Sequence, residues 1–260
     1  MRPVVASPTR LKMVLRALPG IEFRLGWLRD HLSETPLEQA ADELHALCEE
    51  GEQSVPDARE ALLAVAALFA ELGECELVQR LRVEAHGRSL LSLERFLRRG
   101  ADSPRADPPL EEFSIPDYGT GRELTVGERR SLARRPDRRA FEKLLSDPHP
   151  LVLRQLMQNP KLTEDDVLVL ATRRPARTVA LEQIVAAPDW LSRRRVRMAI
   201  LLNPGTPSHI AMPLVILCTR QELRELADAA DIPLVLRVTA RELFERKPPL
   251  GAMAKDPPLQ

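Results

Sequence analysis

Aromatic residues are scarce in this chain: only 3% of its 260 residues are Phe, Trp or Tyr, whereas 44% are hydrophobic. Leu, Ala and Val must therefore supply the core, with Arg and Glu at the surface. This composition favours helices over sheets, because small and straight-chain residues are good helix formers and few residues suit a pleated surface. We predict an all-α protein.

Long apolar runs, a leader and paired cysteines are lacking as well. The longest uncharged apolar run, Ala61 to Ala70, is about half of what a membrane helix needs. The N-terminal stretch scatters Arg and Lys among short apolar pieces, unlike a signal peptide. Three separated cysteines, Cys48, Cys75 and Cys218, cannot form a disulfide framework. We therefore expect a cytoplasmic protein with reduced thiols and no membrane segment.

Charge is balanced over the whole chain but not along it. Residues 1–110 carry 14 Lys+Arg and 18 Asp+Glu, a net charge of −4. Residues 122–247 carry 23 Lys+Arg and 16 Asp+Glu, a net charge of +7. Such an asymmetry bears on partners, or on docking between the two halves, and not on the fold.

Two proline-rich stretches divide the chain. Residues 101–121 hold four prolines among acidic and small residues, which is typical of an extended linker. The tail, residues 248–260, has no apolar period and is expected to be disordered. We therefore predict an N-terminal helical domain over residues 1–100, the linker, and a repeat domain over residues 122–247 that precedes the tail.

Start and stop signals predict about six helices, paired as hairpins, in the N-terminal domain. Ser7 and Pro8 start the first, which ends at Leu18. The others are expected at 21–32, from Thr35 to Gly51, and at 57–72, 74–86 and 89–99. Thr35 and Glu38 have the spacing of a capping box. The helix at 57–72 is apolar on nearly every side and should be the central buried element.

A repeated pattern marks the second half of the chain. Three segments align: 124–161, 162–205 and 206–247. The first two share four anchors, which are a capping box (Thr125/Glu128, Thr163/Asp166), Arg-Arg-Pro (134–136, 173–175), a break near positions 147 and 189, and Asn-Pro (159–160, 203–204). Because proline bars the preceding residue from the α region, these dipeptides fix where helices end. The breaks at 147, 189 and 231 give a 42-residue spacing and predict a three-unit α-solenoid whose third unit is a cap.

The strings SDPHPLVLRQLMQNPKLTEDDVLVLAT and APDWLSRRRVRMAILLNPGTP resemble the leucine-rich repeat variant family and the wider HEAT-like α-solenoids, over roughly residues 122–247. The resemblance implies right-handed stacking of helical units and a protein-binding role, and it carries no catalytic residue. The units here are longer than those of the leucine-rich variant. The third segment also lacks both Arg-Arg-Pro and Asn-Pro.

Arginines repeat in register along this second half. The ten candidates are Arg134, Arg135 and Arg138, which align with Arg173, Arg174 and Arg177, and the cluster Arg193, Arg194, Arg195 and Arg197. Cations at a helix C-terminus complement its dipole and need no ligand, which accounts for the Arg-Arg pairs. The cluster lies near a helix start, where positive charge is unfavourable. A solvated surface and a binding face both stay open, and we predict that these arginines bind an acidic protein surface.

Nucleic acid is the alternative partner, because HEAT-like solenoids that bind DNA exist. Against it, the net charge of +7 is moderate and Trp190 is the only aromatic residue in 142–243, so no stacking platform accompanies the arginines. Trp190 and the adjacent Asp189 are expected to pack at a corner and to cap a helix, and not to act as a catalytic pair.

No motif for a cofactor, metal or nucleophile is present. His45 and Cys48 have a possible metal-ligand spacing but no third or fourth ligand nearby, so a buried thiol beside a half-exposed His is favoured. The glycines serve as helix stops and form no phosphate-binding loop. We predict a non-catalytic, regulatory scaffold or adaptor without a cofactor, for which a signalling protein is one candidate partner.

Overall fold

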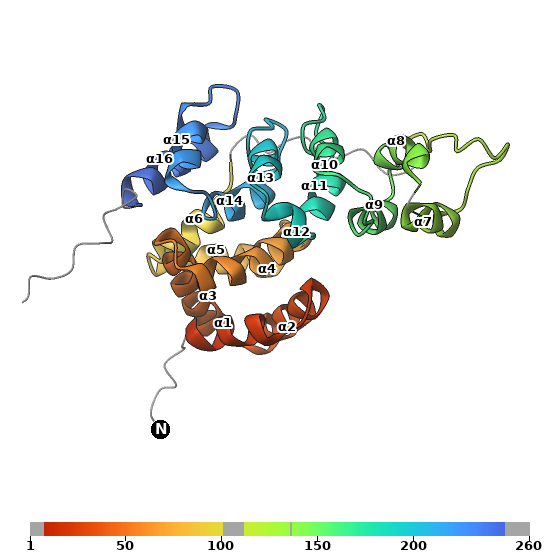
Figure 1. The fold of residues 1–260 in the computed structure, drawn as a ribbon. Helices are drawn as coiled ribbons and strands as arrows, with labels where there is room; N and C mark the ends of the chain where they lie inside the picture. The colour runs from red at the N-terminus through yellow and green to blue at the C-terminus, as the bar shows by residue number, and fades with distance from the viewer. Residues whose placement is uncertain (1–7, 101–111, 136, 248–260) are drawn as a thin grey trace, which may run out of the picture.

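The computed structural model describes residues 8–100, 112–135 and 137–247. Within these ranges every regular element is a helix and none is a strand (Figure 1). The predicted all-α fold is therefore confirmed. The predictions for Ser7, for residues 101–111 and for the tail 248–260 lie outside the described residues.

Helices of the N-terminal block begin and end close to the predicted residues. They are α1 (Pro8–Ala17), α2 (Ile21–Glu34), α3 (Leu37–Glu52), α4 (Pro56–Leu72), α5 (Glu76–Gly87) and α6 (Leu91–Phe96). Pro56 opens α4 at its first position, where a missing N–H does no harm. Gly73 ends α4 with a φ of 57°, which glycine adopts without strain.

The capping box predicted at Thr35 and Glu38 is wrong. The N-cap of α3 is Pro36, which has no side-chain hydrogen bond to offer. Thr35 instead ends α2, where its backbone N–H donates to the carbonyl of His31 at 2.9 Å. Because proline follows it, Thr35 is held in extended backbone (ψ 136°), and so it belongs to the preceding helix.

Helix α4 is the central element of the molecule, as its apolar sequence predicted. It packs against α1, α2 and α3 of its own block and also against α11, α12 and α14 of the second block. From Ala64 to Ala70 every side chain is buried. Alanines on several faces let neighbouring helices approach closely, so α4 joins both blocks within one continuous apolar core.

The second block is a series of mostly short helices. They are α7 (Val126–Arg134), the 3₁₀ turn Arg138–Ala140, α8 (Phe141–Leu145), α9 (Pro150–Met157), α10 (Glu164–Ala171), α11 (Thr178–Val185), α12 (Pro188–Leu191), α13 (Arg194–Leu201), α14 (Ser208–Val215), α15 (Arg220–Asp228) and α16 (Leu234–Arg246). Figure 1 shows them lying along one side of the N-terminal block, with α7, α8 and α9 projecting beyond it.

These helices pack in two rows. One row runs α7, α9, α11, α14, α16, and the other runs α8, α10, α13, with α15 joined to α13 by ion pairs (Figure 1). Successive helices alternate between rows, apart from the short α12 at a corner. The aligned segments 124–161 and 162–205 therefore start in different rows. The repeating unit of the packing is therefore a pair of successive helices, one from each row. This unit does not coincide with the 42-residue segments aligned in the sequence.

The two Asn-Pro anchors nevertheless form the same local structure. Asn203 is buried, and its Nδ2 donates to the carbonyls of Ala171 (2.9 Å) and Arg173 (3.0 Å), at the end of α10. Its Oδ1 accepts the backbone N–H of Gly205. The equivalent bonds join Asn159 to Ala133, Arg135 and Lys161. Each asparagine thus satisfies carbonyls that the end of a short helix leaves without partners.

Both capping boxes predicted in the second block are present. Thr125 with Glu128 caps α7, and Thr163 with Asp166 caps α10. A third box, formed by Thr219 and Glu222 at the start of α15, was not predicted. In each box the carboxylate accepts the backbone N–H of the threonine, which is one of the donors that a helix start leaves unpaired.

Part of the predicted linker is anchored to the second block. We call residues 113–118 the strap. At one end the ring of Phe113 lies 4.8 Å from the guanidinium carbon of Arg177. At the other end the Tyr118 hydroxyl donates to the buried carboxylate of Asp147 at 2.7 Å. The strap thus has no helix or strand, but its side chains contact the second block at both ends.

Polar contacts between the two blocks add to the apolar contacts that α4 makes. Arg98, just beyond α6, donates to Thr239 at 2.7 Å and pairs with Glu242 at 3.1 Å, both on α16. Arg59 of α4 donates to the carbonyl of Leu217. In the described ranges, no helix is at once long and apolar enough to cross a membrane.

Candidate functional site

The candidate arginines lie largely in ion pairs within the chain. The exposed pairs are Arg138–Asp166, Arg193–Glu164 (3.3 Å), Arg195–Asp165 (3.1 Å) and Arg194–Glu225 (2.9 Å). Each joins two different elements of the second block, and the first three involve the start of α10. Burial alone would raise the pKa of Asp166, but hydrogen bonds from Arg138 and Thr163 outweigh it and lower that pKa.

Two of the ten arginines are buried, which corrects the expectation of a single exposed face. Arg177 donates to the carbonyl of Asp147 at 3.2 Å, beneath the ring of Phe113. Arg197 donates to Glu222 at 2.8 Å, where both side chains are almost fully enclosed. A buried guanidinium needs such partners, and therefore these two side chains cannot contact another protein.

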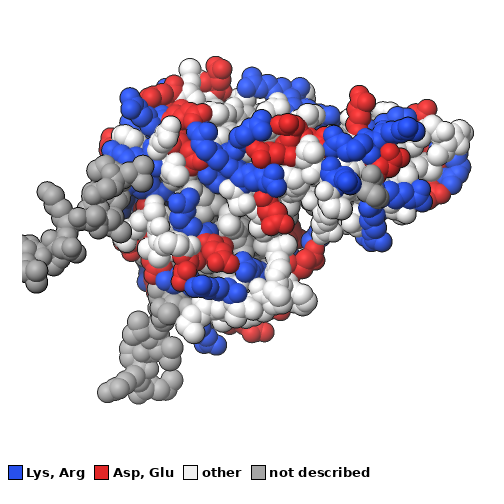
Figure 2. Space-filling model, in the orientation of Figure 1, with Lys and Arg blue, Asp and Glu red and all other residues white. Residues whose placement is uncertain are grey.

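The other four arginines make weaker contacts. Arg134 donates to Gln155 at 3.0 Å, and Arg173 donates to the hydroxyl of Ser146 at 3.3 Å. The side chains of Arg135 and Arg174 make no hydrogen bond or ion pair with the part of the chain that the structure describes. Figure 2 shows basic and acidic side chains interleaved over this side of the molecule, and not a continuous basic stripe.

The ion pairs explain why basic residues are tolerated at the start of α13. Positive charge near a helix N-terminus opposes its dipole. Here Glu164 forms ion pairs with both Arg193 and Arg195, and Glu222 forms ion pairs with both Arg194 and Arg197. The sequence contains these carboxylates, but their pairing depends on how the helices lie in the row. Local spacing therefore could not reveal it.

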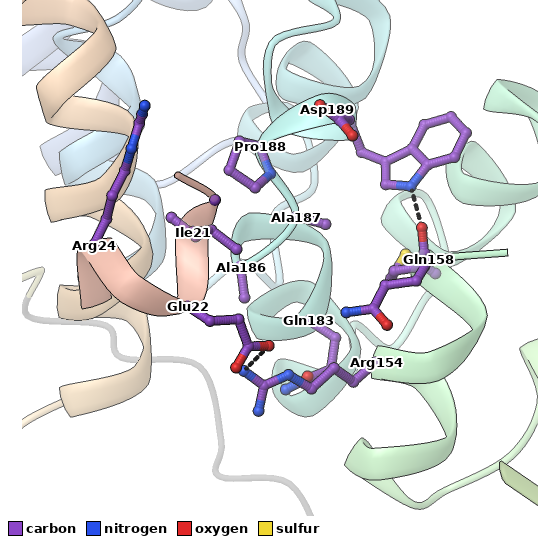
Figure 3. Close-up of a pocket in the computed structure, with 13 residues that line it drawn as sticks. Ile21, Glu22, Arg24, Arg154, Gln158, Gln183, Ala186, Ala187, Pro188 and Asp189 are labelled. Carbon is purple, nitrogen blue, oxygen red and sulfur yellow. Dashed lines mark hydrogen bonds and ion pairs between the residues drawn. The ribbon is translucent and has the colours of Figure 1, made fainter. Parts of the chain in front are cut away.

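A groove between the two blocks is a feature that the sequence did not reveal. It has a volume of about 500 Å³ and lies between the start of α2 and the ends of α9, α11 and α12 (Figure 3). The apolar part of its lining comprises Ile21, Met157, Ala186, Ala187, Pro188 and Trp190. The polar part comprises Glu22, Arg24, Arg154, Gln158, Gln183 and Asp189.

Charged residues span or flank the groove. Glu22 of α2 meets Arg154 of α9 at 3.0 Å, and both side chains are exposed (Figure 3). Arg24 points away from that pair, donating to the carbonyl of Leu18 and to Glu60, each at 3.2 Å. The pair between Glu22 and Arg154 is a solvent-exposed bridge and contributes less than about 1 kcal/mol. A ligand could therefore displace it at small cost.

Trp190 forms a rigid wall of the groove. Its Nε1 donates to the carbonyl of Met157 at 2.9 Å, and the guanidinium of Arg193 lies 4.4 Å from its ring. The expected corner packing is thus found. Asp189 is exposed and lies inside the first turn of α12, so it does not cap that helix from outside as expected. The two residues share no contact that would make a catalytic pair.

Side-chain amides at the groove retain hydrogen-bonding capacity. The side chain of Gln183 on α11 makes no hydrogen bond with the described residues, and neither does the carboxylate of Asp189. Gln158 accepts a bond from Gln155 at 3.4 Å and keeps its own N–H groups free. An amide both donates and accepts, which suits the backbone of an extended peptide. Apolar walls with a few free polar groups are typical of binding sites.

The other two residues considered from the sequence, His45 and Cys48, lie on α3. Cys48 is buried in the core, where burial raises the pKa of its thiol well above the usual value. Within the described ranges, no three His, Cys, Asp or Glu side chains are grouped so as to hold a metal ion. His45 and Cys48 thus stand apart from further ligands.

Comparisons with known proteins do not add a family. No protein-family model, no curated protein and no solved structure matches this chain. The class that the fold defines is an all-helical protein, and arguments about function depend on the groove and on the charges described above.

Proposed function

We propose that this chain is a non-catalytic scaffold that binds another protein through the groove between α2 and α9–α12. The observation that carries the proposal is the lining of that groove: apolar walls, free amides and one displaceable ion pair. The lining contains no Ser, Thr, Cys, His or Lys, and its two carboxylates are Glu22, which is paired with Arg154, and the exposed Asp189.

The proposed partner presents an extended segment. A groove of about 500 Å³ accommodates a few side chains rather than a folded domain. Apolar side chains of the segment would cover Ile21, Met157 and Pro188. Its backbone would pair with Gln158 and Gln183. Burial of the apolar side chains would supply affinity. Hydrogen bonds between the backbone and the amides would fix the register of the segment in the groove.

The exposed candidate arginines of the second block, which we call the arginine edge, have a secondary role in this proposal. Four of the exposed arginines, Arg138, Arg193, Arg194 and Arg195, already have carboxylate partners within the chain, so a second acidic surface would have to compete with these carboxylates. The same competition weakens the case for nucleic acid, because neutralised arginines release few counterions from phosphates. A gel shift with any duplex at low salt is expected to show no complex, and a steep salt-dependent shift would revive the nucleic-acid alternative.

The proposed repeat class and cellular compartment rest on the amino-acid sequence. We take the two rows of helices to be an α-solenoid of the HEAT-like or leucine-rich variant type, with a helix pair as its unit. Such solenoids commonly serve as protein-binding scaffolds. We place the protein in the cytoplasm, where the free thiols of Cys48, Cys75 and Cys218 would stay reduced.

Photo-crosslinking tests the groove directly. A benzoylphenylalanine placed at Gln183, inside the groove, should capture a discrete protein in an extract of the source cells. The same residue at Gln221, an exposed position on α15, is the matched control and should capture none. Equal capture from both positions, or none from Gln183, would count against the proposal.

A further inference from the structure

A second hollow lies at the far end of the rows, beneath the strap. It has a volume of about 590 Å³ and is separate from the groove between the blocks. Its lining comprises Phe113, Ser114, Ile115, Glu123, Arg129, Pro148 and His149. In Figure 1 this region lies around α7, α9 and the segment that leads into α7. Nothing in the scaffold proposal requires it.

Asp147 forms the polar base of this region and is fully supplied with donors. Its carboxylate accepts Nη1 of Arg129 at 2.7 Å, the Tyr118 hydroxyl at 2.7 Å and the backbone N–H of His149 at 2.9 Å. Burial and the hydrogen bond to Asp147 raise the pKa of Tyr118, so the phenol stays protonated. The carboxylate therefore holds the strap, α7 and the start of α9 together.

Arg129 has more donors than Asp147 can use. Only Nη1 is engaged, although a guanidinium carries five N–H groups. Nε is buried without a partner. Nη2 makes no hydrogen bond with the described residues either, and Arg129 is one of the residues that line the hollow. A buried guanidinium with a free edge favours an acceptor at that position.

His149 supplies a second donor. Its Nδ1 accepts the backbone N–H of Leu151 at 3.2 Å, where it serves as the N-cap of α9. The ring proton must then lie on Nε2. Burial, followed by the positive charge of Arg129, lowers the pKa of His149, so the ring is neutral near pH 7. A neutral ring with Nε2–H donates a hydrogen bond without adding charge.

The hollow is surrounded by charged groups of both signs. Arg129 and Arg130 both act on His149, and Arg177 lies behind the ring of Phe113. The opposing carboxylates are Asp147 and Glu123. The remaining walls are apolar, from Phe113, Ile115 and Pro148. A single guanidinium with unused N–H groups beside an apolar wall suits a monoanion with an apolar body better than a dianion.

We propose that this hollow binds a small carboxylate with an apolar body. The carboxylate oxygens would accept from Nη2 of Arg129 and from Nε2–H of His149, while the apolar body covers Phe113 and Ile115. A planar, charge-assisted pair of hydrogen bonds is the arrangement that a guanidinium favours. Glu123 at the same hollow disfavours phosphate, because the second negative charge would be repelled.

The test uses the full chain and defined probes. Sodium phenylacetate and sodium 3-methylbutanoate are titrated while the His149 ring is followed by ¹H–¹³C NMR. Saturable shifts of the ring signal are expected, together with a higher pKa of His149, because a bound anion favours its charged form. The neutral analogue 2-phenylethanol should leave the ring signal unchanged. Inorganic phosphate binding in place of both carboxylates would overturn the ligand class.

Two variants locate the site. R129K keeps a cation for Asp147 but removes the free guanidinium edge, and it should weaken phenylacetate binding about tenfold, the equivalent of one charge-assisted hydrogen bond. S114W fills the hollow from an exposed position and should abolish binding, whereas E112W, exposed and outside the lining, should not. S114W protects the test if R129K fails to fold. Unchanged binding in S114W would refute the site.

Discussion

The two blocks of this molecule are stabilised in different ways. In the N-terminal block, α1 to α5 are 10 to 17 residues long, and α1, α2 and α3 pack around the apolar α4. In the second block, α7 to α15 have only 4 to 9 residues. A short helix leaves most of its backbone polar groups near an end, without an intrahelical partner.

In the second block, buried polar side chains supply hydrogen-bond partners for these backbone groups. Asn159 and Asn203 bind carbonyls at helix ends, and Asp147 and Glu222 bind N–H groups at helix starts. Lys247 likewise donates to the carbonyl of Ile216 at 3.2 Å, just beyond α14. The lesson is that helix length decides whether apolar packing suffices or specific polar bonds must support the fold.

The largest effect is expected at Asp147. D147N would leave the buried charge of Arg129 without its counter-ion, so the free energy of unfolding should fall by about 4 kcal/mol. Urea denaturation measures this directly. D231N, at an exposed aspartate, is the control and should change little. A loss below about 1 kcal/mol in D147N would show that the second block does not depend on its polar bonds.

A somewhat smaller loss is expected at the asparagines. N203A removes three hydrogen bonds and leaves a buried carbonyl, a half-buried carbonyl and one N–H unsatisfied, which should lower stability by about 3 kcal/mol. N159A is predicted to behave alike, because it makes the same bonds. The comparison would be weakened if both variants melted within a degree of the parent chain.

In the N-terminal block, overpacking should matter instead. A Cβ on Gly51 would lie 2.2 Å from Cδ1 of Leu62 and 3.2 Å from Cγ2 of Ile216. G51A should therefore cost about 2 kcal/mol. G26A makes no such contact and lies inside α2, so it should raise stability by about 0.5 to 1 kcal/mol. Thermal unfolding that shifts both variants in the same direction would contradict this packing.

The histidine cap of α9 gives a pH dependence. Because the pKa of His149 is lowered in the folded chain, the unfolded chain binds the proton more readily below about pH 6.5. Stability from this group is thus full above that pH and falls as the pH drops toward the folded pKa. H149N keeps an N-cap that does not titrate. The melting temperature of the parent relative to H149N should be lower at pH 5 than at pH 8.

The smallest effect is expected at the exposed ion pairs. R195A removes pairs with Glu164 and Asp165 on the surface and should change the free energy of unfolding by less than about 0.5 kcal/mol. Denaturation in low and high salt should give the same result within error. A loss of several kcal/mol would mean that the surface pairs, and not the buried ones, stabilise the rows.

Much of the local structure could be predicted from the sequence. Pro56 and Gly73 bound α4, and Thr163 with Asp166 caps α10, because both signals act within one turn of helix. The same logic failed at Thr35, where Pro36 moved the boundary. It missed Thr219, although Glu222 follows at the correct spacing. Local signals thus predict helix ends well but do not rank competing caps.

The candidate site was out of reach of such reasoning. Glu22 and Arg154 are 132 positions apart and meet only because α4 joins the two blocks. Similarly, the exposed arginines were expected to face a partner, whereas the structure pairs Arg195 with Asp165 and Arg138 with Asp166. Charge along a sequence does not reveal which charges neutralise each other across neighbouring helices.

The most direct test of the scaffold proposal compares two variants against the partner captured from Gln183. Q158W fills the groove between the blocks, and the triple variant R193A/R194A/R195A strips the exposed arginine cluster. We predict that Q158W abolishes binding in calorimetry while the triple variant binds within about threefold of the parent chain. Loss of binding in the triple variant, with Q158W unaffected, would contradict the account and return the site to the arginine edge.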